Sequence, residues 1–357
     1  MFNGKSIVYA RWFTFLFFFL STSLHSELIE FYADWSWNSK GTKLFTPLLG
    51  RGKEEWEVLW RIQARMQERG WEIKCWDYEF YRPFLLKGDF ESWKSRKTDQ
   101  SGDLWVFWNM GGRLSDFDLS RMPKEKLILF MWEPPTVQPS LYTPEVQALF
   151  GKIFTWDDDL IDNQKFFKFN YPALKKRIEK IPNFDQKKLC VMINTHLIDK
   201  HPKALYGERE KAARFFEDKE GEFDLYGRFW DKKEFKNAMG KVESKAITLA
   251  KYKFCICYEN MRDVKGYITE KIFDCFMAGC IPIYWGASNI TDYIPADCFI
   301  DRRAFTSMEE LYLFMKEMSC EEYQRYLEQS GEFLKSEKAQ VFSRDACVEI
   351  FMDQLIH

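Results

Sequence analysis

The sequence predicts an α/β protein of two domains, each built on a parallel β-sheet, with a cleft between them. Three observations support this fold class. The chain has 357 residues, which is enough for two domains of ordinary size. Short apolar runs alternate with segments of helical spacing along most of its length. A Lys-rich stretch with two prolines, residues 171–188, separates the two halves of this pattern and is the expected linker.

The first half of the pattern predicts one βαβ-type domain, residues 27–180. Residues 53–69 keep apolar side chains at helical spacing up to Gly70, which predicts a helix that stops there. The runs 103–108 and 126–132 are short and strongly apolar, as expected of parallel strands covered on both faces. The strands predicted for this domain are 27–33, 71–76, 103–108 and 126–132.

The second half resumes the alternation and predicts a second domain, residues 181–335. Its expected strands are 190–194, 223–227, 252–258, 281–286 and 298–300. Its expected helices are 209–218, 268–279 and 308–318. Residues 336–357 contain a further helix, at 345–356, which could pack back toward the first domain. Because open parallel sheets bind ligands beyond the carboxyl ends of their strands, we expect a ligand site in the cleft.

The first 26 residues are expected to be a targeting segment. Lys5 and Arg11 precede an apolar run from Trp12 to Leu20, which is too short to cross a bilayer as a helix, since that needs roughly 20 residues. The Ser-rich stretch that follows favours a cleaved signal peptide over a short membrane anchor extended upstream. We therefore expect the protein in the secretory pathway or at a membrane, and on its cytoplasmic face if the source is bacterial.

The composition excludes several kinds of site. The formal net charge of −2 gives no sign of a basic face for nucleic acid. The nine cysteines include no CxxC pair, so we expect them to pack as small apolar side chains rather than to form disulfides or a zinc site. Of the four histidines, His25 lies in the leader and His357 is the last residue. A general base is therefore expected to be a carboxylate.

A strongly polar segment, YENMRDVKGYITEK at 258–271, lies between a predicted strand and a predicted helix. At such a junction, unpaired backbone N–H groups and the helix dipole favour an anion. Lys271 would add positive charge there, while Glu270, Tyr267 and Asn260 could hold or orient a ligand. The alternative interpretation is that these side chains only decorate a solvated helix start.

Arg228 is a second basic residue expected at the same edge of the sheet, because it follows the predicted strand 223–227. An Arg and a Lys on neighbouring loops can bind a diphosphate together. The sequence contains neither a P-loop nor a GxGxxG dinucleotide fingerprint. We therefore expect a phosphate site of the kind that nucleotide-sugar transferases use.

One long segment resembles a known family. YKFCICYENMRDVKGYITEKIFDCFMAGCIPIYWGASNITDYIP, residues 252–295, is similar to the signature of the α-1,3/4-fucosyltransferases, glycosyltransferase family 10. The core of that signature runs F-E-N, a short polar loop, Y-[IV]-T-E-K and later P-[IV]-x-x-G. FDLYGR and HPKALYGEREKAARFFE resemble its upstream elements, and FMWEPP at 130–135 resembles an amino-domain E-S-P motif. The resemblance extends from about residue 126 to 305.

The resemblance implies a GT-B fold and an inverting transfer of L-fucose from GDP-fucose to an oligosaccharide hydroxyl, in α-1,3 or α-1,4 linkage. It implies that the carboxy-terminal domain holds GDP-fucose, that the amino-terminal domain holds the glycan acceptor, and that neither a tightly bound cofactor nor a catalytic metal is needed. The residues that match donor contacts are Arg228, Asn260, Tyr267, Glu270 and Lys271.

Within this match, Arg228 and Lys271 correspond to diphosphate contacts, and Glu270 to a residue near oxocarbenium-like charge. Glu133 matches the proposed general base that takes the proton of the acceptor hydroxyl. The motif reads E-P-P here, so Glu133 lacks the neighbouring hydroxyl of E-S-P. Tyr258 stands where the family has Phe, and the loop 261–265 has no assigned role.

Several alternatives remain open at this point. WDDDL at 156–160 is similar to a D-x-D metal site, but acids that cap a helix after a strand are the favoured interpretation. HLIDKH at 196–201 is interpreted as a loop, and NIT at 289–291 matches a glycosylation sequon. The functional alternatives are a related transferase with another nucleotide sugar, a non-catalytic carbohydrate-binding protein, and a glycoside hydrolase that uses Glu133 and Glu270.

Overall fold

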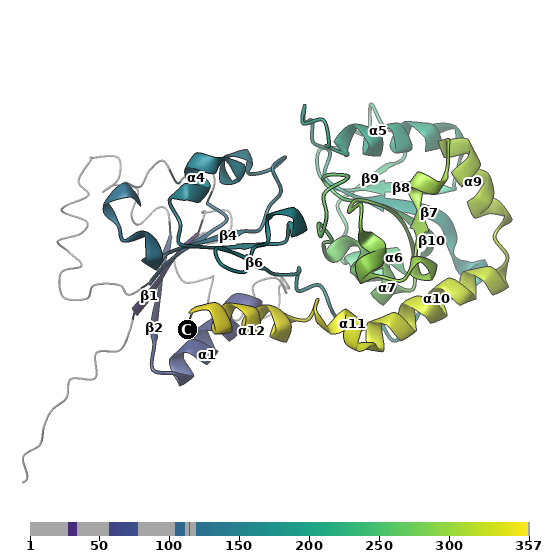
Figure 1. Cartoon of the computed structure of the whole chain (residues 1–357). Coiled ribbons are helices and arrows are strands. Elements are labelled where there is room, and N and C mark those ends of the chain that lie inside the picture. The colour runs from purple at the N-terminus through teal and green to yellow at the C-terminus, as the bar shows by residue number, and fades with distance from the viewer. Residues whose placement is uncertain (1–27, 34–56, 78–103, 111–113, 115–118, 356–357) are drawn as a thin grey trace, which may run out of the picture.

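The computed structural model describes residues 28–33, 57–77, 104–110, 114 and 119–355. These residues form two α/β lobes, each with a six-stranded parallel sheet (Figure 1). The two sheets follow one another along the chain, as the two runs of alternating strand and helix predict. The predicted fold class is therefore confirmed.

The amino-terminal sheet has the strand order β2-β1-β3-β4-β5-β6. Its strands are β1 (Leu28–Ala33), β2 (Glu72–Asp77), β3 (Leu104–Trp108), β4 (Leu127–Met131), β5 (Lys152–Thr155) and β6 (Phe166–Lys168). The helices of this part are α1 (Glu57–Glu68) and α4 (Pro144–Ala148). The first four strands lie within one residue of their predicted ends. The sequence analysis missed β5 and β6, which have only four and three residues.

The carboxy-terminal sheet has the strand order β12-β11-β10-β7-β8-β9. Its strands are β7 (Lys188–Ile193), β8 (Phe223–Tyr226), β9 (Ala238–Gly240), β10 (Tyr252–Tyr258), β11 (Ile281–Trp285) and β12 (Ile300–Asp301). Its helices are α5 (Tyr206–Phe215), α6 (Lys245–Leu249), α7 (Glu270–Ala278), α8 (Ile290–Tyr293), α9 (Met308–Glu317) and α10 (Cys320–Lys335). β12 begins later than predicted, because Ala296–Cys298 form a 3-10 turn.

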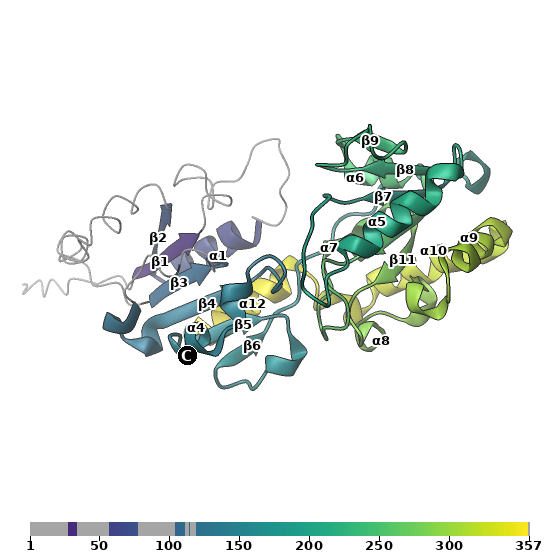
Figure 2. The same ribbon diagram turned by 90° about the horizontal axis from the view of Figure 1, so that it is seen from above.

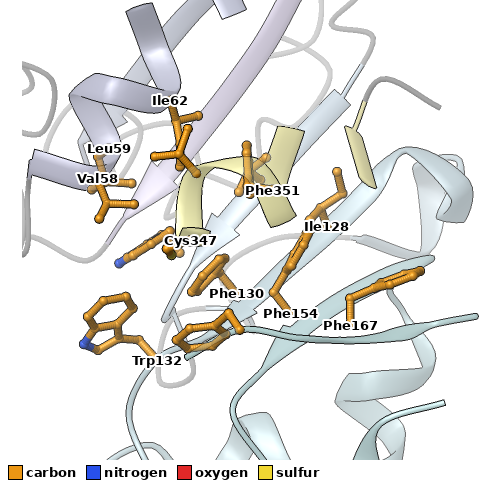
Figure 3. Packing of buried hydrophobic residues seen from close by; sticks show 14 of the residues in the cluster. Val58, Leu59, Ile62, Ile128, Phe130, Trp132, Phe154, Phe167, Cys347 and Phe351 are labelled. Atoms are coloured by element: carbon orange, nitrogen blue, oxygen red, sulfur yellow. The ribbon is translucent and has the colours of Figure 1, made fainter. Parts of the chain in front are cut away.

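The end of the chain returns to the amino-terminal lobe. After α11 (Glu337–Gln340), helix α12 (Arg344–Leu355) lies beside α1, and both views place it on the first lobe (Figures 1 and 2). Phe351 of α12 packs with Ile62 of α1 and Phe130 of β4 in one buried cluster (Figure 3). The first lobe is therefore built from two separate stretches of sequence.

Two segments of chain cross between the lobes side by side. Residues 169–187 connect β6 to β7 and contain only one 3-10 turn, Phe184–Gln186. The N–H of Leu174 in this segment donates to Phe342 O (3.1 Å), and the Arg344 side chain donates to Leu174 O (3.3 Å).

No helix within the described residues has the length and apolar character needed to cross a bilayer. The expected targeting segment lies outside these residues.

Candidate active site

A cavity of about 560 Å³ opens between the two lobes. It lies beyond the carboxyl ends of β7, β8 and β10, where a ligand site is expected in an open parallel sheet. Five of the six residues predicted from the sequence line this one cavity: Glu133, Arg228, Asn260, Glu270 and Lys271. Glu133 comes from the amino-terminal lobe, and the other four come from the carboxy-terminal lobe.

Helix α7 begins at the cavity and presents Glu270 and Lys271 in its first turn. Thr269 caps the helix, since its Oγ1 accepts a hydrogen bond from the Lys271 N–H (3.5 Å). The helix ends where Gly279 adopts the left-handed conformation, at φ +62°. The polar segment of the sequence thus starts a buried helix whose positive end is directed at the cavity.

Glu259 supports this helix start, and the sequence analysis did not single it out. Its side chain is fully buried at the end of β10. Its carboxylate accepts hydrogen bonds from Thr269 N (2.9 Å), Thr269 Oγ1 (2.8 Å) and Lys271 Nζ (2.9 Å). The segment between Glu259 and Lys271, which are twelve positions apart, gives no periodic signal, so only the fold brings the pair together.

The charges at the start of α7 keep two side chains ionised. Burial by itself would raise the pKa of the Glu270 carboxyl, but the ammonium groups of Lys271 and Lys245 lower this pKa to about 2. Burial by itself would lower the pKa of Lys271, but the carboxylates of Glu259 and Glu270 raise it above its ordinary value. A carboxylate and an ammonium group therefore face the cavity together at neutral pH.

Arg209 is the second site residue that sequence reasoning missed. It lies on α5, is only 2% exposed and lines the cavity. Its Nη2 donates to Tyr258 O (2.8 Å) and Asn260 Oδ1 (2.9 Å), and its Nε has no hydrogen-bond partner among the described residues. No described carboxylate forms an ion pair with it, although buried charges are normally paired. Such a guanidinium can take up an anion.

Arg228 reaches the same cavity from the end of β8 and is exposed. The chain turns there at Gly227, with φ +138°, and a Cβ at this position would lie 1.7 Å from Asn194 O. Only glycine permits this approach between the segments after β7 and β8. Arg209, Arg228 and Lys271 thus bring three cations to the cavity from three different elements.

Glu133 sits on a fixed backbone opposite these cations. Its N–H donates to Asn109 Oδ1 (2.9 Å), and its carbonyl accepts a hydrogen bond from Tyr142 OH (2.8 Å). The carbonyl of the preceding Trp132 accepts hydrogen bonds from Trp156 Nε1 (3.1 Å) and Tyr171 OH. The half-buried Glu133 is therefore presented to the cavity by a held loop of the amino-terminal lobe.

The structure does not place Tyr267 among the residues that line the cavity, and its expected donor contact stays a prediction. The Tyr267 side chain is 1% exposed and packs with Trp156 and Tyr171, at ring-centroid distances of 4.5 and 6.2 Å. Burial raises the pKa of its hydroxyl well above the ordinary value. The physical reason is that the loop before α7 inserts its apolar side chains into the first lobe. Tyr267 therefore joins the two lobes by packing.

The loop 261–265, which had no role at the level of sequence, docks the two lobes. Met261 and Val264 are buried in the core cluster of the amino-terminal lobe. Lys265 Nζ lies 2.7 Å from Asp159 Oδ1. Gly266 has φ +75° and passes so close that a Cβ would lie 2.3 Å from Trp156 O. The loop therefore couples the start of α7 to the lobe that carries Glu133.

Asp158 completes this contact between the lobes. Its carboxylate accepts hydrogen bonds from Lys168 Nζ (2.6 Å), Asn289 Nδ2 (2.9 Å) and Tyr293 OH (2.7 Å). Burial would raise the pKa of this carboxyl, but the hydrogen bonds from Lys168 and Asn289 lower it. The Oδ1 atom of Asn289 accepts the N–H of Gly266 (2.9 Å). The amide of the predicted sequon is thus engaged between the lobes.

The structure also shows where the remaining candidate residues from the sequence lie. Asp157 caps the 3-10 turn Asp158–Leu160, which confirms the capping interpretation of WDDDL. His196 stacks on Trp230 at a ring-centroid distance of 4.3 Å, within a segment that is a loop as predicted. Within the described ranges, no three His, Cys, Asp or Glu side chains are grouped as metal ligands. Of the eight cysteines whose side chains the structure describes, all are free and seven are buried.

Known proteins resemble this chain in sequence and in fold. Residues 185–349 match the family model described as glycosyltransferase family 10 (fucosyltransferase), C-term. An alpha-(1,4)-fucosyltransferase of Arabidopsis thaliana is 41% identical over 70 residues, which are 20% of this chain and 17% of that protein. A 4-galactosyl-N-acetylglucosaminide 3-alpha-L-fucosyltransferase 9 of Mus musculus is 28% identical over 204 residues, 56% of this chain and 51% of that protein.

The chain thus spans about half, or less, of the length of these curated relatives. A crystal structure of an alpha1,3-fucosyltransferase with GDP-fucose covers 93% of this chain and 92% of its own, with a TM-score of 0.51 and 15% identity. At this identity the likeness concerns the fold alone. It confirms the GT-B-like arrangement of two facing α/β domains that the resemblance implied.

Proposed function

Because residues 185–349 match the model of glycosyltransferase family 10 (fucosyltransferase), we propose that this chain belongs to that family and transfers L-fucose from GDP-fucose to an oligosaccharide hydroxyl, with inversion at the anomeric carbon. The observation that carries the proposal is the lining of one cavity from both lobes. Glu133 lies on one side, and the ionised Glu270 lies on the other with five basic side chains, those of Arg209, Arg228, Lys241, Lys245 and Lys271. The carboxy-terminal lobe would bind the donor and the amino-terminal lobe the glycan acceptor.

The cations suit the diphosphate of a nucleotide sugar. Arg209, Arg228 and Lys271 would contact its oxygens, and a buried Arg that has no carboxylate partner among the described residues favours such an anion. Negative charge grows on the departing GDP as its bond to the sugar breaks, so fixed cations stabilise the transition state more than the ground state. We propose that these side chains supply the charge and that neither a divalent metal nor a bound cofactor is required.

The two carboxylates would have different tasks. Glu133 would take the proton of the acceptor hydroxyl while that oxygen bonds to the anomeric carbon, as the bond from this carbon to the β-phosphate oxygen breaks. Glu270 stays ionised beside Lys271, so it would stabilise positive charge that develops on the sugar ring. Asn260, held by Arg209, would orient the donor. One base and one good leaving group suffice for this single displacement.

The acceptor, the linkage and the cellular place belong to the proposal as well. We propose a glycan acceptor that is fucosylated in α-1,3 or α-1,4 linkage. We also propose that residues 1–26 direct the chain to the secretory pathway or hold it at a membrane. Neither nucleic acid nor a second protein is needed for the transfer.

Calorimetric titration of the purified chain with GDP, GDP-fucose, GDP-mannose and UDP-galactose tests the proposal. We expect both GDP and GDP-fucose to bind in the micromolar range, on the order of −8 kcal/mol, and UDP-galactose to bind at least about tenfold more weakly. Failure of every GDP species to bind would contradict the donor site. A preference for UDP-galactose would indicate another nucleotide-sugar transferase, and glycoside hydrolysis that GDP does not inhibit would indicate a hydrolase.

A further inference from the structure

Glu259 places a carboxylate where burial makes its charge unfavourable. Its side chain is 0% exposed, and removing a carboxylate from water costs several kcal/mol unless it is paired and hydrogen-bonded. The structure satisfies it from α7: Thr269 donates through N and Oγ1, and Lys271 donates through Nζ. Room for the carboxylate comes from Gly286, where a Cβ would lie 2.6 Å from Glu259 Cγ. The fold is thus built around this group.

Lys271 depends on the same carboxylate. Its ammonium group has three N–H donors, and two acceptors lie at 2.9 Å (Glu259 Oε2) and 3.0 Å (Thr269 Oγ1). The third donor remains for a ligand in the cavity that Lys271 lines. The side chain is 19% exposed, so its orientation is set by these two bonds rather than by water. Glu259 itself does not line the cavity.

We propose that Glu259 is a positioning residue, which holds the Lys271 ammonium charged and directed at the cavity so that Lys271 can bind the diphosphate of the donor. This inference rests on the proposed function. Thr269 belongs to the same hydrogen-bond network, because its hydroxyl bridges Glu259 and Lys271 and also caps α7. Without the carboxylate, the ammonium would lose one of its two counter-charges and one of the two hydrogen bonds that orient it.

The charge of Lys271 depends on groups from several elements. Burial disfavours its charged form, while Glu259, which follows β10, and Glu270 on α7 favour it. Arg209 on α5 opposes it, and Tyr206 on the same helix also lies nearby. Glu133 enters the cavity from the other lobe. Among the described residues, Glu259 is the only one of these groups that forms a hydrogen bond with Lys271 Nζ, so its removal should lower the pKa of Lys271 most.

The test is calorimetric titration of GDP into the full chain and into Glu259→Gln, from about pH 7 to about pH 9. The ratio of the two affinities at each pH cancels the ionisation of GDP itself. We expect the variant to bind GDP about 3–10-fold more weakly at pH 7, with a further loss of up to about tenfold by pH 9, because Lys271 then loses its proton. A ratio that does not change with pH would overturn the inference.

Asp224→Asn is the matched control. Asp224 is a buried acid of β8 that accepts a hydrogen bond from Lys188 Nζ (2.8 Å) and lies outside the cavity. Its loss should reduce stability and leave the pH dependence of GDP affinity unchanged. Glu259→Asp keeps the charge, so its affinity ratio to the unaltered chain should be independent of pH. This variant also keeps the test possible if Glu259→Gln does not fold, and a ratio that falls with pH would contradict the inference.

A double-mutant cycle with Lys271→Met separates positioning from a general structural effect. If Glu259 acts through Lys271, adding Glu259→Gln to Lys271→Met should not weaken GDP binding further. An additional loss equal to that of the single variant would overturn the inference. If the unaltered chain binds no GDP at all, the proposed function fails before this question arises, so the two failures are distinguishable.

Discussion

Gly266→Ala tests whether the loop before α7 couples the two lobes. At φ +75° an Ala costs about 1–2 kcal/mol relative to an allowed conformation. Its Cβ would also lie 2.3 Å from Trp156 O and 2.9 Å from Asp158 Cγ, both on the other lobe. Overpacking of this kind typically costs about 1–3 kcal/mol. We therefore expect the free energy of unfolding to fall by about 2–5 kcal/mol.

Gly221→Ala is the matched control, because Gly221 has φ +78° with nothing within 4 Å of its added Cβ. It should lose only the conformational part, about 1–2 kcal/mol. Urea denaturation of the two variants and the unaltered chain measures the difference. Gly266→Ala should also lower the transfer rate by up to about 100-fold, since displacement of one lobe moves Glu133 away from the donor. Equal losses of stability in both variants would refute the role of this close approach.

Two further predictions concern the cavity itself. Arg209→Met should weaken GDP binding at least about tenfold while changing the free energy of unfolding by less than about 2 kcal/mol, because this buried charge has no ion-pair partner to lose among the described residues. Calorimetry measures the GDP affinity, and urea denaturation measures the stability. Unchanged GDP affinity would remove Arg209 from the site. Glu270→Gln should lower the transfer rate by about 10²–10³-fold without weakening GDP binding. Because the folded pKa of Glu270 is lowered to about 2, its contribution to stability is fully present above its unfolded pKa of about 4.3 and is lost as the pH falls toward 2. The stability difference between the unaltered chain and Glu270→Gln should therefore shrink over this range, and a constant difference would contradict the assigned ionisation.

Much of the fold follows from local patterns in the sequence. The strands β10 and β11 and helix α7 are predicted almost to the residue, because their apolar runs are long and a glycine marks the end of the helix. The strands β5 and β6 were not predicted, since three or four residues carry too little periodicity to distinguish a strand from a loop. Helix α10 lies within the last 50 residues, whose pattern is helical, but no bounds of its own were predicted for it.

The site was predictable where its residues follow strands. Arg228 and Asn260 lie at strand ends, so topology alone brings them to one edge of the sheet. Arg209 could not be found in this way, because an Arg among Glu and Lys on a helix has the pattern of a solvated face. Only tertiary packing buries it. The role of Glu259 could not be predicted for the same reason, since only the fold of the chain brings its carboxylate to Lys271.

Tyr267 lies away from the cavity lining, although its sequence context would place it there. A ring and a hydroxyl next to a ligand loop suggest a contact with the ligand, and the family match points the same way. The fold instead packs the ring against Trp156 and Tyr171 of the first lobe. Sequence alone could not separate the two roles, because packing between lobes depends on how the whole domains meet.

The most direct test of the central claim is a comparison of transfer rate and GDP affinity in Glu133→Gln. Glu133 is proposed to remove the proton, and the opposite lobe is proposed to bind GDP. We therefore expect a kcat for fucose transfer that is lower by about 10²–10⁴-fold, with a GDP dissociation constant within about twofold of the unaltered chain. Undiminished transfer, or a loss of GDP affinity as large as the loss of rate, would contradict the account.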